Sequence, residues 1–159
     1  MCAVNHKPMI SEELAAFLES GLSITAGTRN DELQPDGARV WAMRVHEDRT
    51  HMTVYLYAKA APPMLRNLEA NGLLALSIDR PSDSRACQIK GTFAGSRRGR
   101  AAERAEITRQ VDGFLQQLEA IGIPRVMTAG WEFWPCVAVD IRVTQLFEQT
   151  PGPGAGDPI

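Results

Sequence analysis

Lys59 stands where a cation and a helix N-terminus could together hold a phosphate. It follows the alternating segment 51–57 and lies three residues ahead of Pro62, a residue type that favours the first turn of a helix. Helix N-termini and lysine ammonium groups both attract anions. On this local pattern alone an ordinary exposed lysine is the favoured interpretation, and an anion-binding position at Lys59 is the alternative.

The histidines offer little support for acid–base or nucleophilic chemistry. His46 and His51 flank a predicted turn at residues 47–50, which favours a solvated turn, and His6 stands alone near the start of the chain. The sequence has no GxSxG motif and no cysteine with an evident His and Asn context. We therefore predict no covalent hydrolase chemistry and no metal site, and we assign no catalytic residue.

The cysteine count and the charge restrict the compartment and the partners. Cys2, Cys87 and Cys136 include no CxxC pair, which favours free thiols in a reducing cytoplasm. The net charge of -2 gives no general attraction to nucleic acid or to an anionic membrane. No apolar run approaches the roughly 20 residues that span a bilayer, and the N-terminus lacks the apolar core of a signal peptide. We expect a cytoplasmic protein that binds neither nucleic acid nor membrane.

The run Ser96-Arg97-Arg98-Gly99-Arg100 is the densest group of cations in the sequence. Such a run could bind phosphate or nucleic acid. It lacks the interleaved aromatic residues on which bases stack, and only 6% of the chain is aromatic. A solvated loop is the interpretation that this pattern favours.

Hydrophobic periodicity predicts the elements that position these residues. Segments of period two, short apolar runs and turn residues between them are typical of antiparallel strands. Apolar positions spaced by three and four indicate one long amphipathic helix and two short ones. We expect helices at 11–21, 62–72 and 99–122 and strands at 22–31, 38–45, 51–57, 73–78, 86–94 and 137–144.

These elements predict a mainly β (α+β) fold, a six-stranded antiparallel split β-barrel with flanking helices. Residues 1–148 would form this single domain. The tail 149–159, QTPGPGAGDPI, is too rich in Pro and Gly for regular structure, and we expect it to be disordered or else docked across a dimer. Asp36, with Pro35 before it and Gly37 after it, is predicted to form a turn ahead of the second strand.

Three stretches carry a resemblance to a known family: 39–44 (RVWAMR), 65–78 (LRNLEANGLLALSI) and 87–91 (CQIKG). Together with the order of the elements, they resemble the FMN-binding split barrels related to pyridoxamine 5'-phosphate oxidase. The similarity runs from about the first helix to the last strand.

The resemblance implies a homodimer that binds FMN in a cleft between its two subunits. The flavin ring would lie along the second strand, and the phosphate near the end of the third strand and the following helix. The residues that it assigns to cofactor binding are Arg39, Ala42, Met43, Arg44, Tyr57, Ala58, Lys59, Arg66, Gln88 and Trp131.

The sequence also departs from that family. Its phosphate clamp of Ser, Arg and Lys corresponds here to Pro62-Pro63-Met64, and a hydroxyl side chain is missing at Ala58. The phosphate would then depend on Lys59, Arg66 and Arg44. The glutamine of the closing strand aligns with Ala86 more naturally than with Gln88.

Three functions fit these observations. The first is an FMN-dependent oxidoreductase of unknown substrate, and the second is a non-catalytic protein that holds flavin, haem or another planar ligand. A dimer without ligand is the third. For Trp131 the alternatives are core or interface packing, which aromatic residues mostly do, and coverage of a ring system.

Overall fold

The computed structural model describes residues 9–159, so Cys2 and His6 lie outside the described residues. Helices and strands follow one another in the order expected from the sequence. They are α1 Glu12–Leu18, β1 Ser23–Arg29, β2 Pro35–Val45, β3 His51–Tyr57, α2 Pro62–Asn71, β4 Leu73–Asp79, β5 Ala86–Arg98, α3 Arg104–Ala120 and β6 Cys136–Glu148, with 3₁₀ turns at Ala101–Glu103 and Arg125–Met127.

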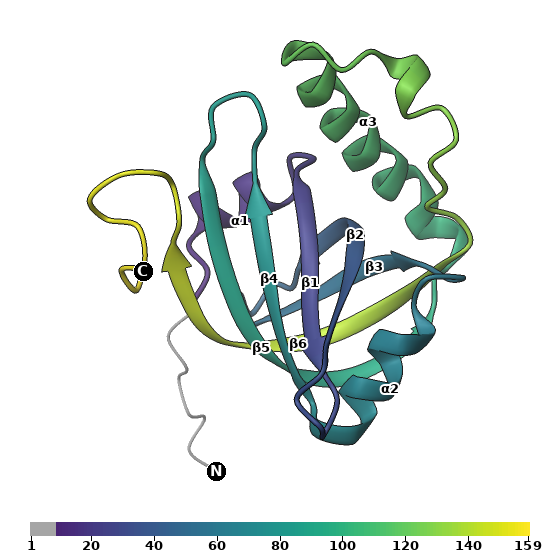
Figure 1. Cartoon of the computed structure of the whole chain (residues 1–159), viewed down its shortest axis with the longest axis vertical. Helices are drawn as coiled ribbons and strands as arrows, with labels where there is room; N and C mark the ends of the chain where they lie inside the picture. The colour runs from purple at the N-terminus through teal and green to yellow at the C-terminus, as the bar shows by residue number, and fades with distance from the viewer. Residues whose placement is uncertain (1–8) are drawn as a thin grey trace.

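The six strands form a closed antiparallel barrel in the order β1-β2-β3-β6-β5-β4 (Figure 1). Every neighbouring pair is antiparallel, as the short connections predicted. Helix α3 lies to one side of the barrel and α2 near one end of it (Figure 1). The expected six-stranded barrel with flanking helices is confirmed.

Strand β2 changes partner along its length. It pairs with β1 from Pro35 to Val40 and with β3 from Val40 to Val45, with a register shift between Val40 and Ala42. Beyond this shift, backbone groups of β2 form hydrogen bonds with the side chains of Gln110 in α3 and of Glu19, the residue that follows α1. Gln110 of α3 accepts from the Met43 N–H at 3.0 Å and donates to the Met43 carbonyl at 2.8 Å, and Glu19 accepts from the Val45 N–H.

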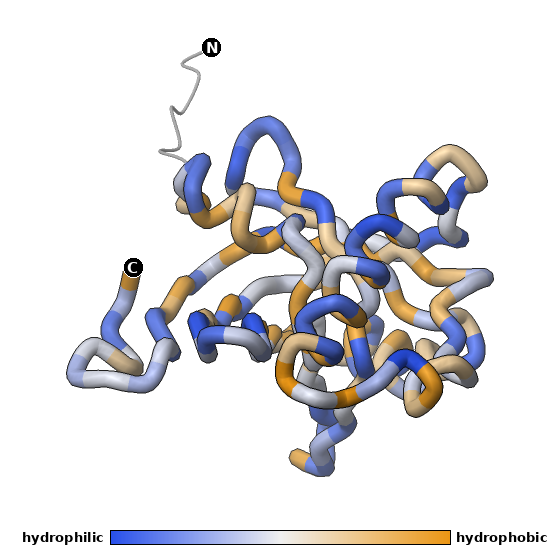
Figure 2. Tube along the Cα trace, turned by 90° about the horizontal axis from the view of Figure 1, so that it is seen from above, coloured by the Kyte–Doolittle hydropathy of each residue, from blue (hydrophilic) through white to orange (hydrophobic). Residues whose placement is uncertain are grey.

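Side chains alternate between the two faces of each strand, so the hydrophobic residues form two separate clusters. Met43, Val54, Leu56 and Val139 belong to the main core that fills the barrel. The opposite faces of the same strands carry Ala42, Tyr55 and Ala138, which pack with Ile107 and Val111 of α3. Hydrophobic and hydrophilic residues accordingly follow one another along the trace in Figure 2.

Two glycines let α3 approach the end of α1. Gly21 has φ +90°, a conformation that L side chains rarely adopt. A Cβ on Gly113 of α3 would lie 2.8 Å from the Ser20 carbonyl oxygen. This close contact fixes the position of α3 relative to the barrel.

Two local expectations were wrong. Pro35, Asp36 and Gly37 form the first residues of β2 and pair with Arg29, Thr28 and Gly27, so the turn lies before them. The basic run expected as a loop continues β5, because Arg97 and Arg98 pair with Ala138 and Val137 of β6. In both cases strand pairing outweighs local turn propensity.

The C-terminal tail folds back against its own chain. The Glu148 N–H donates to the Asp157 carbonyl, the Ile159 N–H donates to the Leu146 carbonyl, and Pro158 forms a bridge with Phe147. In Figure 1 the tail loops back beside the end of β6.

Two further sequence-based expectations concern thiols and membranes. Cys87 and Cys136 are free, as expected, and burial raises the pKa of both, that of Cys87 to about 12. Among residues 9–159, no helix has the length and apolar character needed to cross a membrane.

Candidate functional site

Arg39 of β2 lies among aromatic side chains that come from three parts of the chain. Its guanidinium carbon is 5.7 Å from the ring centroid of Trp41, 5.2 Å from that of Phe114 and 5.6 Å from that of Trp131. These four residues form what we call the Arg39 cluster. Burial lowers the pKa of Arg39, although the charge of Asp79 opposes the shift.

One guanidinium nitrogen of Arg39 has no hydrogen-bond partner. Its Nη1 is buried, and within the part of the chain that the structure describes no acceptor reaches it. A buried donor without an acceptor is costly, and more so when it is charged. The Arg39 cluster therefore holds a buried, charged donor whose hydrogen-bonding capacity is unused within the described residues.

Trp131 closes the Arg39 cluster towards solvent. Its ring stacks on Phe114 with centroids 6.2 Å apart and tilts against Trp41 at 5.8 Å. The residue is nevertheless 42% exposed. Within one chain Trp131 packs as aromatic residues mostly do, and it keeps enough exposed surface to contact a ligand or a partner.

The predicted phosphate end lies next to the Arg39 cluster. The Tyr57 hydroxyl donates to Glu132 Oε2 at 2.8 Å, and Lys59 Nζ lies 5.8 Å from the Tyr57 ring centroid. Contact with Tyr57 and the charge of Glu132 raise the pKa of Lys59. Because Trp131 and Glu132 are adjacent, the structure brings Arg39, Tyr57, Lys59 and Trp131 to one region.

The start of α2 offers few donors to an anion. Ala61 at the N-cap makes no side-chain cap, and Pro62 and Pro63 have no N–H group. Ala58 uses its N–H to donate to the Pro135 carbonyl at 2.9 Å. Of the first three helical residues, only Met64 has an N–H group.

Ala42 and Met43 present no side-chain surface in this chain. Both side chains are completely buried, Ala42 beneath α3 and Met43 in the barrel core. The backbone N–H and carbonyl of Met43 both form hydrogen bonds with the side chain of Gln110. The ligand contacts predicted for these two residues remain predictions that would require α3 to move.

Arg44 lies apart from the Arg39 cluster, in a cavity beyond the start of α3. Arg97 and Arg100 line this cavity with it. Sequence reasoning assigned these two arginines to a solvated loop. The density of cations at 97–100 was a sequence signal for a charged site. The sequence does not show that Arg44 lies near these cations, because their proximity depends on the pairing of β2, β3, β6 and β5.

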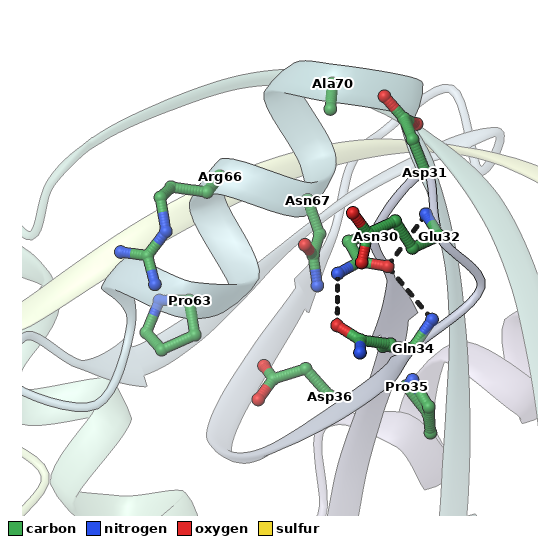
Figure 3. A pocket seen from close by; sticks show the side chains of 10 residues that line it. All are labelled: Asn30, Asp31, Glu32, Gln34, Pro35, Asp36, Pro63, Arg66, Asn67 and Ala70. Carbon is green, nitrogen blue, oxygen red and sulfur yellow. Dashed lines mark hydrogen bonds between the residues drawn. The ribbon is translucent and has the colours of Figure 1, made fainter.

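Arg66 faces an acidic cavity of about 520 Å³ between α2 and the β1–β2 hairpin (Figure 3). Asp31, Glu32 and Asp36 line the hairpin side, where Asn30 holds the turn through hydrogen bonds to Gln34. Arg66 lines the α2 side of this cavity, where its guanidinium group lies beside Pro63 and is directed away from the hairpin carboxylates (Figure 3).

Gln88 lies near the beginning of β5, between Ser77 of β4 and Phe147 of β6. Arg97 lies nine positions further along the same strand, which corresponds to roughly 30 Å of extended chain. Ala86, the alternative to Gln88, is the first residue of this strand. Neither residue lies in the region of Lys59 within one chain.

No protein-family model matches the sequence, and no curated protein matches it. Solved structures are similar at the level of the fold. HupZ of Group A Streptococcus has 17% identity and a TM-score of 0.57, with 93% of this chain and 100% of that chain covered.

Two other solved structures of similar fold bear on the expected cofactor. A putative pyridoxamine 5'-phosphate oxidase of Lactobacillus delbrueckii has 15% identity and a TM-score of 0.53, with 89% and 96% covered. An FMN-binding protein of Syntrophomonas wolfei has 12% identity and a TM-score of 0.50, with 85% and 83% covered. The chain thus has the fold of these proteins, as its sequence predicted.

Proposed function

We propose that this chain binds FMN and acts as an FMN-dependent oxidoreductase related to pyridoxamine 5'-phosphate oxidase. The observation that carries the proposal is the buried, unpartnered Nη1 of Arg39 among three aromatic rings. A flavin ring is flat, and its carbonyl oxygens are acceptors. The fold shared with an FMN-binding protein also supports the proposal.

The residues of this region fit a flavin in complementary ways. Arg39 would donate to an acceptor on the ring, and Trp41 and Trp131 would contact its flat faces. Lys59 would bind the phosphate beside Tyr57. When bound, the flavin supplies the electron or hydride transfer, while the protein orients it and sets its surroundings.

Lys59 would carry a large share of phosphate binding. The two prolines of α2 remove N–H donors, and Ala58 offers no hydroxyl. Glu132, whose charge acts on Lys59, opposes a second anion nearby. The phosphate therefore has few donors besides the Lys59 ammonium group.

Replacing Lys59 with Ala should weaken FMN binding about tenfold to a hundredfold, because a charge-assisted hydrogen bond is lost. Riboflavin, which has no phosphate, should bind both proteins equally. Glu132→Gln should strengthen FMN binding, since it removes a repelling charge. Titration followed by flavin fluorescence measures all of these affinities.

Lys90→Ala is the matched control, because Lys90 is an exposed lysine on β5 that packs over Phe147 instead. Equal FMN affinity in the wild type and Lys59→Ala would mean that the phosphate is bound elsewhere. Failure of the wild type to bind either flavin would overturn the proposal itself.

A non-catalytic flavin-holding protein is the second candidate. The poor donor set at the start of α2 favours it, because an oxidoreductase must retain its cofactor through repeated turnover. Anaerobic mixing of the FMN-loaded protein with NADH or NADPH separates the two. Bleaching of the flavin absorption band supports the enzyme if a subsequent acceptor restores it repeatedly, and an unchanged band supports the holding protein.

The dimer and the cytoplasmic location belong to the same proposal. Two copies would enclose the cofactor, and the exposed ring of Trp131 would be covered by the partner. The reducing compartment was inferred from the scattered cysteines of the sequence.

A further inference from the structure

The cavity of about 520 Å³ between α2 and the β1–β2 hairpin has an acidic wall (Figure 3). Asp31, Glu32 and Asp36 line it from the hairpin, and Arg66 is the cation of the lining. Within residues 9–159, none of these three carboxylates forms an ion pair or accepts a hydrogen bond. The cavity therefore has an excess of negative charge that the described chain does not neutralise.

Asn67 of α2 projects into this cavity in a fixed orientation (Figure 3). The residue is only 9% exposed, and its Nδ2 donates to the Thr28 hydroxyl at 3.0 Å. Its Oδ1 has no hydrogen-bond donor among the described residues and is open to the cavity. Polar atoms of buried side chains are normally hydrogen-bonded, so Asn67 offers an oriented acceptor that a ligand can use.

Asp36 faces the same part of the cavity as Asn67. It is half-buried and lies directly opposite Thr28 in the pairing of β1 with β2. Directly opposed residues of two strands project their side chains to the same face of the sheet. Because Asn67 bonds to Thr28, the carboxylate of Asp36 and the Oδ1 of Asn67 border one position. Two acceptors, one of them charged, favour a donor that carries a positive charge at this position.

The other two carboxylates, Asp31 and Glu32, lie at the turn of the hairpin, which the Asn30 N–H closes by donating to the Gln34 carbonyl at 3.0 Å. The turn is roughly 7 to 10 Å along the hairpin from Asp36. Among residues 9–159, no group of three or more His, Cys, Asp or Glu side chains is placed to hold a metal ion. The negative charge is thus spread along the hairpin, which fits a ligand with separated positive groups better than one metal ion.

Apolar surface lies between these polar groups. Pro35, Pro63 and Ala70 also line the cavity, and methylene groups can pack against them. The guanidinium group of Arg66 lies beside Pro63 and is directed away from the hairpin carboxylates, so it leaves them available (Figure 3). The cavity therefore combines separated acidic positions with an apolar strip.

We propose that this cavity binds a small aliphatic polyamine. One ammonium group would donate to Asp36 and to the Oδ1 of Asn67, and a second, a few methylene groups away, would lie beside Asp31 and Glu32. The site goes beyond the flavin proposal and does not depend on it. Because Asp31 and Glu32 are exposed, screening keeps binding weak, with a dissociation constant of about 1 mM at low salt.

The test is calorimetric titration of the flavin-free protein with spermidine, putrescine and butylamine at low ionic strength. Asp36→Asn should weaken spermidine binding about tenfold, because a charge-assisted hydrogen bond is lost. Butylamine, which has a single ammonium group, should bind about threefold more weakly than putrescine. Glu69→Gln is the matched control, because it removes an exposed carboxylate of α2 that does not line the cavity.

Two further measurements do not depend on a loss of binding. Arg66→Gln should strengthen spermidine binding about threefold, because it removes a competing cation from the cavity, and unfolding of the variant cannot produce such a gain. The side-chain amide signals of Asn67, followed by NMR, should shift with spermidine in the wild type and in Glu69→Gln.

Several results would overturn the proposal. Absence of saturable spermidine binding would do so, and equal weakening by Asp36→Asn and Glu69→Gln would assign binding to the general charge of the protein. Equal affinity for putrescine and butylamine would contradict the second ammonium position. Mg²⁺ that binds more tightly than spermidine and depends on Asp36 would identify a metal site instead. Lys59→Ala should leave spermidine binding unchanged, which separates this result from that of the flavin experiment.

Discussion

Glu103 connects several polar groups beside α3. Its carboxylate accepts two hydrogen bonds from Arg97, one from the Tyr55 hydroxyl at 3.0 Å and one from the Arg100 N–H at 2.8 Å. The side chain is only 12% exposed. These bonds, above all those from Arg97, lower the pKa of Glu103 to about 2. Glu103 in turn contributes to the raised pKa of Tyr55, which is mainly due to burial.

Glu103 should therefore give the fold a measurable acid sensitivity. Because its pKa is lower in the folded chain than the ordinary value of 4.5, its stabilisation is present above about pH 4.5 and is lost as the pH falls towards 2. Glu103→Gln should lower the free energy of unfolding by about 2 kcal/mol at pH 7 and by little at pH 2. Urea denaturation at both pH values measures the difference, and a pH-independent difference would contradict this role.

The sequence could predict few of these residue-level contacts. Arg39 and Trp131 were both assigned to the cofactor site through resemblance, but their contact joins positions 92 residues apart. Arg97 and Arg100 looked like loop residues, because a Ser- and Gly-containing basic run has no hydrophobic alternation. Their roles depend on which strands lie opposite, and local sequence does not carry that information.

At the scale of elements, the polar residue Gln110 explains how α3 is held. It lies on the otherwise apolar buried face of this helix, and its amide forms hydrogen bonds with both backbone groups of Met43. The helix itself was predicted from its spacing of apolar residues. The hydrogen bonds of Gln110 to Met43 were not predicted, because a glutamine beside an apolar stripe is ordinarily a residue at the edge of the buried face.

Gln110→Ala should lower the free energy of unfolding by about 1 to 3 kcal/mol, because it leaves the buried N–H and carbonyl of Met43 without partners. Gln116→Ala, at an exposed position of the same helix, should change it by less than about 0.5 kcal/mol. Chemical denaturation of the three proteins provides the comparison. Equal stability of the wild type and Gln110→Ala would show that water replaces the glutamine amide at no cost.

Element boundaries were less predictable than element types. Ala86–Arg98 and Cys136–Glu148 extend well beyond the strands expected at 86–94 and 137–144. Both extensions pair with each other, so each polar end is held by the opposite strand. Cross-strand hydrogen bonding can thus carry a strand through residues such as Arg97 and Gln145 that have weak strand propensity.

For the whole molecule, the order of alternating segments was enough to predict a closed antiparallel barrel. Short connections can join only antiparallel neighbours, because parallel strands need long crossover connections. A closed sheet also avoids exposed edges. The tail was different, because its Pro and Gly content indicated only the absence of a helix or a long strand. Its return along β6 uses backbone bonds that composition does not encode.

Exposed apolar side chains concentrate in the segment between α3 and β6. Val126 is 79% exposed, Met127 69% and Ile121 49%, and Trp131 follows closely. Exposed apolar patches of this kind mark interaction surfaces. Because the segment leads directly into Trp131 and Glu132, a partner that covers it would also border the proposed flavin site. The homodimer inferred from the sequence therefore predicts a coupling between association and cofactor binding.

Val126→Asp should convert the dimer to monomer at micromolar concentration, because it places a charge in an apolar interface. FMN affinity should fall in parallel, since the cleft would lose one wall. Leu33→Asp is the control, because Leu33 is 71% exposed at the tip of the β1–β2 hairpin, far along the sequence from residues 121–131. Sedimentation velocity and FMN titration of the same samples measure both properties. A monomeric wild type would contradict the dimer, whereas a monomeric variant that still binds FMN normally would place the whole flavin site within one chain.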